Sequence, residues 1–291
     1  MGAIIALILV VGTLTACMGG AAADIKGTLP ASMDIPETIT YTVEVEEHEH
    51  IVCDEDGTQL VVYRHEVPVL QAVRSDGSEV EEARSPVEEQ ALETVAVFNE
   101  QFADWTGEEH LRELAGYARA DRSWLAETGV EWEDTRTYTE TLSSTVYQTE
   151  QMVSISASCD SYTGGAHPNR VLMGWNFDLT TGEFFAPEAL AADSQEFSDL
   201  VAEEIIRQAQ IRAAEEDMEP EAFFWEDYRE IAADWGSYAV SFDETGMTVG
   251  YSPYEMACYA AGPQEFTLSY EQLLPGLSDH GKEILGLAEE A

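Results

Sequence analysis

The sequence predicts an α+β protein in which an antiparallel sheet is packed by helices on one side. Two kinds of periodicity support this fold class: stretches that alternate every second residue, as half-buried strands do, and stretches with apolar residues three and four apart, as on helices. Elements of one kind also follow each other in runs, in the order strands, helices, strands, helices, strands. Such runs favour α+β over a doubly wound parallel sheet, in which strands and helices alternate strictly.

The first pair of strands is predicted between residues 39 and 70. Ile39 to Val52 is rich in Thr, Val and Ile, and an acidic turn that ends in Gly57 separates it from the run Leu60 to Leu70. In the second run, apolar and aromatic or histidine side chains alternate with more polar ones, at Val61, Tyr63, His65, Val67 and Val69. Two such runs joined by an Asp-Gly turn predict a β-hairpin.

Two helices follow the hairpin. Ser85 and Pro86 are typical of a helix start, with Ser as the cap and Pro in the first turn. The apolar stripe that follows advances by steps of four, three, four and three, through Ala91, Val95, Phe98, Phe102 and Trp105. Gly107 interrupts this stripe. Glu108 to Glu127 then forms a second predicted helix, whose inward residues are Leu111, Leu114, Tyr117 and Ala118.

The second half of the chain returns to strands after Gly129. Strands are predicted over 135–147, 153–159 and 170–178, the last with one face made by Val171, Met173, Trp175 and Phe177. Helices are predicted from Ser194 to Met218 and from Pro220 to about Ala232. Strands 238–242 and 247–251 form a further hairpin, and a strand at 265–268, a short helix and a polar tail complete the chain.

The charge of the chain limits its partners. There are 57 acidic and 13 basic residues, which gives a formal net charge of −44 spread along the chain. Nucleic acids and anionic lipid surfaces are poor partners for such a surface, because a phosphate binder needs the opposite charge. Basic proteins, cationic peptides and divalent cations are the natural counterparts. The alternative is that the acidity serves only solubility or salt tolerance.

The N-terminus predicts where the protein works. The uncharged run from Ala3 to Leu14 has the length of a secretory signal and is too short to span a bilayer. It closes on Leu14-Thr15-Ala16-Cys17, which resembles the lipobox of bacterial lipoproteins. The resemblance implies a signal peptide over 1–16 and a diacylglyceryl group on Cys17, followed by a tether up to residue 36. We therefore expect an extracytoplasmic protein that its lipid anchors to the bacterial membrane.

The remaining cysteines do not predict a metal site. Cys53, Cys159 and Cys258 lie about a hundred residues apart, which excludes a local Cys-x-x-Cys zinc site. Three cysteines allow one disulfide at most, and the sequence does not determine whether one forms. His48 and His50 would share one face of a strand, but two ligands do not make a structural metal site. No metal and no cofactor are predicted.

Two irregular segments between predicted strands are candidates for a binding surface. The first runs from Ser161 to Asn169 and the second from Tyr251 to Pro263, which interleaves tyrosines with proline, glycine and small residues. The paired glycines of the first segment allow a tight turn with positive φ. The candidate ligand-binding residues of the two segments are Tyr162, Thr163, Gly164, Gly165, His167, Tyr254 and Tyr259.

The two segments contain Tyr-Thr-Gly-Gly-Ala-His and Pro-Tyr-Glu-Met-Ala-Cys-Tyr-Ala-Ala-Gly-Pro. Over about residues 37–275 the chain thereby resembles the paired DUF4163 and DUF3298 domains of bacterial extracytoplasmic proteins. The same pair forms the ectodomain of RsiV-type lysozyme-sensing anti-sigma factors and precedes the catalytic domain of PdaC-type peptidoglycan deacetylases. The resemblance implies an RsiV-ectodomain-like fold with a DUF4163-like subdomain over 37–133, a DUF3298-like subdomain over 134–275 and a polar tail over 276–291.

His167 is the strongest candidate for catalysis, because Asp160, Ser161 and Thr163 are close to it in sequence. Neighbours on an extended segment point alternately to opposite faces, however, so these residues do not predict an assembled nucleophile and base. No catalytic residue is therefore predicted. A second candidate is the acidic segment 215–230 with its four aromatic residues, which is either an amphipathic helix or an acidic rim around aromatic anchors.

These observations predict a lipid-anchored, non-catalytic binding module of the bacterial cell envelope. Its expected ligand is a basic, lysozyme-like protein or a cell-wall component, and no nucleic acid is expected. Two alternatives remain open from the sequence: a peptidoglycan-modifying hydrolase that uses His167, and a purely structural accessory lipoprotein.

Overall fold

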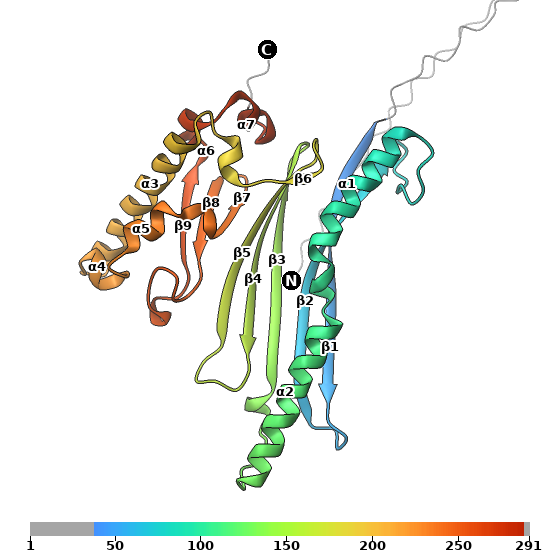
Figure 1. Cartoon of the computed structure of the whole chain (residues 1–291), viewed down its shortest axis with the longest axis vertical. Coiled ribbons are helices and arrows are strands. Elements are labelled where there is room, and N and C mark those ends of the chain that lie inside the picture. Colours follow the sequence, from blue (N-terminus) through green and yellow to red (C-terminus); the bar gives the residue numbers. More distant parts are fainter. Residues whose placement is uncertain (1–37, 288–291) are drawn as a thin grey trace, which may run out of the picture. The chain divides into compact units, whose positions relative to one another are not determined.

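The computed structural model describes residues 38–287, all of which belong to one compact unit. The described strands form two sheets, a six-stranded sheet in the order β1-β2-β3-β4-β5-β6 and a three-stranded sheet in the order β7-β8-β9 (Figure 1). The predicted signal peptide, Cys17 and tether lie outside the described residues. No helix between residues 38 and 287 is both long and apolar enough to cross a membrane.

The six-stranded sheet confirms the predicted α+β class. Its strands are β1 (Ile39–Cys53), β2 (Gln59–Arg74), β3 (Tyr138–Gln148), β4 (Met152–Tyr162), β5 (Asn169–Asp178) and β6 (Glu183–Phe184). Neighbouring strands are antiparallel except β2 and β3, which pair in parallel between Val61–His65 and Tyr138–Leu142. A parallel pair needs a long crossover connection, and two helices supply it here. The proposed boundary between 133 and 134 therefore falls between strands of one sheet.

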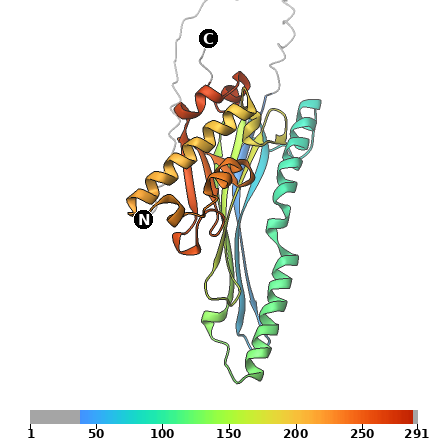
Figure 2. The same ribbon diagram turned by 60° about the vertical axis from the view of Figure 1, so that its left-hand side comes forward.

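Helices α1 (Pro86–Phe102) and α2 (Glu108–Glu127) make this crossover and pack against β2 (Figure 2). The predicted start of α1 is confirmed, because the Ser85 hydroxyl accepts a hydrogen bond from the Glu88 amide. Residues 103–106 form a 3₁₀ turn between the helices, and Gly107 follows it in the left-handed region. Tyr117 was predicted to face inward and is instead 63% exposed. The buried face of α2 contains Leu114 and Ala118. Tyr117, the residue before Ala118, lies outside this face.

The buried side of β2 changes along the strand. Val61, Tyr63, His65 and Val67 are buried as predicted, but beyond them Leu70 takes the core position that the alternation assigned to Val69. The change occurs where β2 leaves β3 and passes along α1. There the side chain of Asn99 bonds both backbone groups of Leu70, at 2.8 Å from its nitrogen and 3.1 Å from its oxygen. Along β2 the buried residues therefore change from odd-numbered to even-numbered positions where its packing partner changes from β3 to α1.

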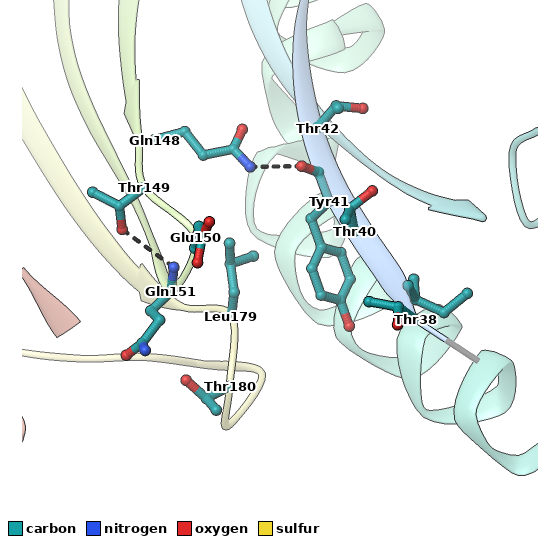
Figure 3. Close-up of a pocket in the computed structure, with 11 residues that line it drawn as sticks. Thr38, Thr40, Tyr41, Thr42, Gln148, Thr149, Glu150, Gln151, Leu179 and Thr180 are labelled. Atoms are coloured by element: carbon teal, nitrogen blue, oxygen red, sulfur yellow. Dashed lines mark hydrogen bonds between the residues drawn. The ribbon is translucent and has the colours of Figure 1, made fainter. Parts of the chain in front are cut away.

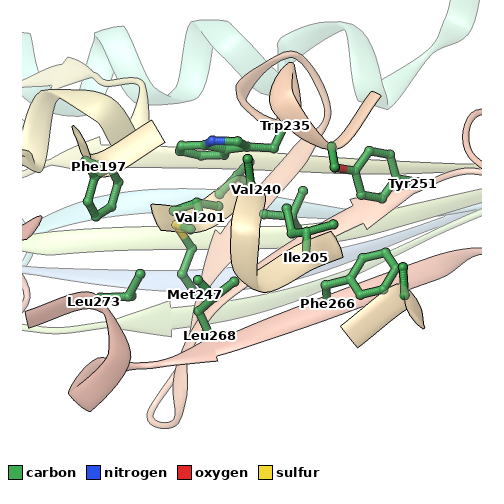
Figure 4. Close-up of a cluster of buried hydrophobic side chains, with 14 of the residues drawn as sticks. Phe197, Val201, Ile205, Trp235, Val240, Met247, Tyr251, Phe266, Leu268 and Leu273 are labelled. Carbon is green, nitrogen blue, oxygen red and sulfur yellow. The ribbon is translucent and has the colours of Figure 1, made fainter. Parts of the chain in front are cut away.

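The three-stranded sheet packs against helix α3 (Ser194–Glu215). Its strands are β7 (Ala239–Phe242), β8 (Gly246–Tyr251) and β9 (Gln264–Ser269), and their inner side chains meet those of α3 in the largest core cluster (Figure 4). The predicted helix over 220–232 is divided into α4 (Pro220–Phe223) and α5 (Tyr228–Ala233). The expectation of a polar tail after 275 is wrong. Residues Asp279–Ile284 form helix α7, and Ile284 and Leu285 are buried because they complete this core.

Strand β7 joins the two sheets by lying against β4 and β5. The buried hydroxyl of Ser154 accepts the amide of Phe242 at 2.7 Å and donates to Asn176 Oδ1 at 2.8 Å. Asn176 Nδ2 in turn donates to the carbonyl oxygen of Val240 at 3.0 Å. Gly174 permits this approach, because a Cβ atom there would overlap the backbone of Val240.

We predict that Gly174→Ala lowers the free energy of unfolding by about 1–3 kcal/mol, because the added methyl group must push β7 away from β5. Gly116→Ala is the matched control. Gly116 lies in α2 with open space around its Cβ position, so alanine there should raise the free energy of unfolding by up to about 1 kcal/mol. Urea denaturation of both variants measures the difference, and equal effects would contradict the assigned close approach.

Candidate functional site

The two segments singled out in the sequence meet in space. The connection between β4 and β5 contains His167, and the loop between β8 and β9 contains Tyr254 and Tyr259. The imidazole of His167 stacks on the ring of Tyr259, with centroids 3.7 Å apart and an angle of 23° between the planes. The Tyr259 hydroxyl donates to the carbonyl oxygen of Pro168 at 2.7 Å. We call His167, Tyr254 and Tyr259 the loop cluster.

Tyr254, the third residue of the loop cluster, has a strained backbone conformation. Its φ is 76°, in the left-handed region that bulky residues rarely adopt, and its side chain is 54% exposed. The Tyr254 hydroxyl donates to His167 Nε2 at 3.4 Å, because His167 Nδ1 already donates to the Pro168 carbonyl oxygen at 2.9 Å. An exposed aromatic ring on a strained backbone is a feature of ligand-binding sites.

Trp225 extends the loop cluster and was not among the predicted site residues. Its indole Nε1 donates to the Tyr254 carbonyl oxygen at 3.0 Å, and its own amide donates to Met256. Trp225 is 37% exposed, whereas Phe224 and Tyr228 on either side of it are buried in the core. The sequence signal was the acidic aromatic segment 215–230. The segment is not one helix, but its aromatic residues Phe224 and Tyr228 are in the core, as the amphipathic interpretation predicts. The interpretation as an acidic rim around aromatic anchors stays a prediction.

The other predicted site residues belong to the end of β4 and to the turn between β4 and β5, outside the three rings of the loop cluster. Tyr162 ends β4, where it pairs with Thr139, and Thr163 and Gly165 lie in the exposed turn. Gly164 has φ of 86° and passes beside Asp121 of α2, which accepts a hydrogen bond from Tyr138. A side chain at this φ would be strained, so the turn requires glycine here.

The residues next to His167 in sequence do not assemble around it. Asp160 binds Arg170 through two hydrogen bonds of 2.8 and 2.9 Å, and the ring nitrogens of His167 are bonded to Pro168 and Tyr254. His167 is thereby held as a flat partner of Tyr259. This geometry suits contact with a ligand surface better than proton transfer to or from a nucleophile.

A second polar cluster joins β2, β3 and α2, and no sequence pattern pointed to it. His65 and Glu140 are buried, with His65 Nε2 3.0 Å from one Glu140 oxygen, and His110 Nε2 lies 2.9 Å from the other. His65 Nδ1 lies 2.9 Å from the carbonyl oxygen of Trp105, which can only accept, so this nitrogen carries a proton. The Glu140 carboxyl is thereby held between the imidazoles of His65 and His110.

The groups around Glu140 are poor nucleophiles. Burial raises the pKa of Glu140, but the hydrogen bonds from His65 and His110 outweigh it and leave the pKa below its usual range. Burial, with Glu140 nearby, raises the pKa of the Cys159 thiol to about 12 and raises that of Tyr63 as well. Tyr63 stacks on His65 with centroids 3.8 Å apart. The cluster therefore acts as a structural connection between the sheet and the crossover helices.

A groove of about 880 Å³ lies between the start of β1 and the β3–β4 turn (Figure 3). Threonine and glutamine side chains dominate its walls, and the ring of Tyr41 projects into it (Figure 3). Gln148 crosses the groove and donates to the Tyr41 carbonyl oxygen at 2.7 Å. No residue of this groove was predicted as a site residue, because its walls come from segments about a hundred residues apart.

The other histidines and cysteines of the described residues form no further cluster. His48 lies on the same face of β1 as His50 and approaches Glu46 at 3.4 Å without hydrogen-bond geometry. Within residues 38–287, no group of three or more His, Cys, Asp or Glu side chains is placed to hold a metal ion. Cys53, Cys159 and Cys258 are free thiols.

The Glu140 cluster predicts how stability depends on pH. Its folded-state pKa is lowered, so the cluster stabilises the protein above the ordinary carboxyl pKa of about 4.3, and this contribution is lost as the pH falls through the lower folded value. Glu140→Gln should cost about 1–3 kcal/mol at pH 7. Denaturation curves of the two proteins should converge at low pH. Asp160→Asn, in an exposed pair, should cost less than about 1 kcal/mol, and an equal cost would contradict the assignment.

Comparison with known proteins places part of this architecture in a family. Residues 183–271 match the family model described as protein of unknown function (DUF3298). A search of curated proteins found no match. The matched segment contains β6 to β9, α3 and the loop that holds Tyr254 and Tyr259.

Two solved structures are similar to the chain. A member of the DUF3298 family from Bacteroides fragilis has 16% sequence identity and a TM-score of 0.55, over 87% of this chain and 100% of that one. A DUF3298 family protein from Pseudomonas aeruginosa has 18% identity and a TM-score of 0.44, over 82% of this chain and 95% of that one. The first shows a shared fold that extends beyond the matched segment. The similarity of this chain to the DUF3298 family therefore rests on the sequence of segment 183–271 and on the fold shared with the first structure.

Proposed function

We propose that this protein is a non-catalytic binding module of the bacterial cell envelope, and that the loop cluster is its contact surface. The observation that carries the proposal is the meeting of His167, Tyr254 and Tyr259 from two loops about ninety residues apart in sequence. The rings of His167 and Tyr259 are stacked, and the Tyr254 hydroxyl bonds His167 while the Tyr254 side chain stays more than half exposed. Such fixed aromatic side chains bind with little loss of conformational entropy.

The partner that suits this surface is a basic protein, with a lysozyme-like protein as the leading example. Aromatic residues supply the central contacts of many interfaces, and Trp225 adds a fourth ring beside Tyr254. The net charge of −44 attracts a basic protein over a distance and orients it. The sheet and core hold the loops in place, so the surface is formed before the partner arrives.

The cellular location is part of the same proposal. The lipobox-like Leu14-Thr15-Ala16-Cys17 supports an anchor in the outer face of the membrane, with the folded residues outside the cytoplasm. A lipid in one leaflet holds a domain at the surface, which suits capture of a soluble protein in the envelope.

Two substitutions at Tyr254 separate binding from stability. Tyr254→Ala and Tyr254→Gly both remove the ring and should weaken binding of a basic animal lysozyme at least tenfold, measured by calorimetry at low ionic strength. Glycine tolerates φ of 76°, so Tyr254→Gly should be more stable than Tyr254→Ala by about 1 kcal/mol. Equal loss of binding by two variants that differ in stability shows that the missing ring, and not unfolding, is the cause.

Tyr117→Ala is the control for this experiment, because Tyr117 is also a more than half-exposed tyrosine and lies on α2 outside the loop cluster. It should bind lysozyme as the wild type does. Wild-type affinity should fall as salt is added. If the wild-type protein shows no association even at low ionic strength, lysozyme-like proteins are removed as partners.

We predict that Cys17 carries the lipid. Metabolic labelling with a fatty-acid probe should label the wild-type chain, and Cys17→Ala should abolish the label and release the protein from the membrane fraction. Cys258→Ala is the matched control, since Cys258 is an exposed thiol in the folded part and should leave labelling unchanged. Labelling that survives Cys17→Ala would contradict the anchor.

A further inference from the structure

Strand β1 is the edge strand of the six-stranded sheet. It is 15 residues long, and among the described strands it pairs with β2 alone. Its centre is exposed to solvent, including Val45 at 41% and Ile51 at 49%. A strand of this kind presents a row of unpaired backbone groups to which another chain can add.

The pairing with β2 determines which residues of β1 point outward. Val45 lies opposite Pro68, which has no N–H, so their pair is not a hydrogen-bonded one. The backbone groups of Leu70 and Ala72 on β2 also point away from β1, because Asn99 and Val80 bind them. Hydrogen-bonded and non-hydrogen-bonded pairs alternate along an antiparallel ladder. The odd-numbered residues of β1 therefore direct their N–H and C=O groups to the free edge.

One end of this edge is already capped within the molecule. Gln148 donates to the Tyr41 carbonyl oxygen at 2.7 Å (Figure 3). It also accepts a hydrogen bond from the Val43 amide at 3.3 Å. This contact independently confirms that odd-numbered residues face outward. Beyond the cap, Val45, Glu47, Glu49 and Ile51 have no hydrogen-bond partner for their outward groups within residues 38–287. They form a continuous open edge about 20 Å long.

The side chains along the open edge select its partner. Natural edge strands are commonly protected by charged side chains, proline or a bulge. Between residues 44 and 51 this strand has no proline, its register shifts only at Val52/Cys53, and its acidic side chains are the protection that it does have. Four glutamates occupy the stretch, Glu44, Glu46, Glu47 and Glu49, of which Glu49 also pairs with Arg64. A second copy of this chain would bring the same glutamates into opposition, which disfavours self-pairing. A basic strand would pair with them.

We propose that the open edge of β1, Val45 to Ile51, binds an extended basic segment of another polypeptide as an added β-strand. The backbone of Val45, Glu47, Glu49 and Ile51 supplies the ladder, and the glutamates pair with lysine or arginine on both faces of the added strand. Val45 and Ile51 contact apolar residues at its two ends. This surface is separate from the loop cluster and does not depend on the function proposed for it.

The test uses an end-capped octapeptide with four central lysine and arginine residues between valine and threonine ends, added to the purified full chain. Binding should slow amide hydrogen exchange at least tenfold at Val45, Glu47, Glu49 and Ile51. The amides of Glu46, His48 and His50 already bond β2 and should change little. If the peptide does not slow hydrogen exchange at these four outward amides, the proposal is wrong.

Two matched comparisons separate strand addition from simple charge attraction. Glu47→Pro removes one outward N–H without touching the ladder to β2, and it should bind the peptide about fivefold more weakly than Glu47→Ala, which removes the same charge. A peptide of the same charge with alternate backbone amides N-methylated should bind at least tenfold more weakly. Equal binding of the methylated peptide, or loss of peptide binding in Tyr254→Gly, would show that the edge is not the site.

Discussion

Two buried polar side chains, Ser154 and Asn176, hold the backbone of β7 against the six-stranded sheet. Each of them bonds a backbone group of β7, and they also bond one another, so removing either would leave buried partners unsatisfied. Gly174, two residues before Asn176 on β5, lets the backbones of β5 and β7 touch. Because hydrogen bonds have direction and apolar contacts do not, this arrangement fixes the register of β7 as well as its distance.

The loop cluster depends on that register. Two residues before Gly174 on β5, the Leu172 amide donates to the Ser252 hydroxyl at 3.1 Å. This hydrogen bond connects β5 to the start of the loop that holds Tyr254. Pro168 and His167 precede β5 directly, so the same strand carries the other half of the cluster. A shift of β7 and β8 along β5 would therefore separate His167 from Tyr259, although both loops could keep their local shape. The aromatic surface is a product of the packing between sheets.

Local features of the fold followed from the sequence, and features that join distant segments did not. The Ser85 cap, the limits of α2 and the 171–177 strand face depend on neighbouring residues, so periodicity found them. The parallel pairing of β2 with β3 depends on a long crossover and leaves no local signal. Ser154 and Asn176 alternate with apolar residues as solvent-facing side chains do, yet β7 buries them. The candidate loops were identified from their composition, whereas Trp225 and the His65–Glu140–His110 cluster come together only in the folded chain.

The distribution of charge connects the two proposed surfaces. Several of the few arginines are held by carboxylates close by, including Arg64 by Glu49, Arg122 by Asp56 and Arg170 by Asp160. The large excess of carboxylates is left without a cation and gives the surface its field. Such a field attracts any basic partner and weakens with salt, but it does not choose between surfaces. Short-range features make that choice: ring geometry at the loop cluster, and the outward amides of β1 at the sheet edge. A basic protein with one exposed basic strand could use both.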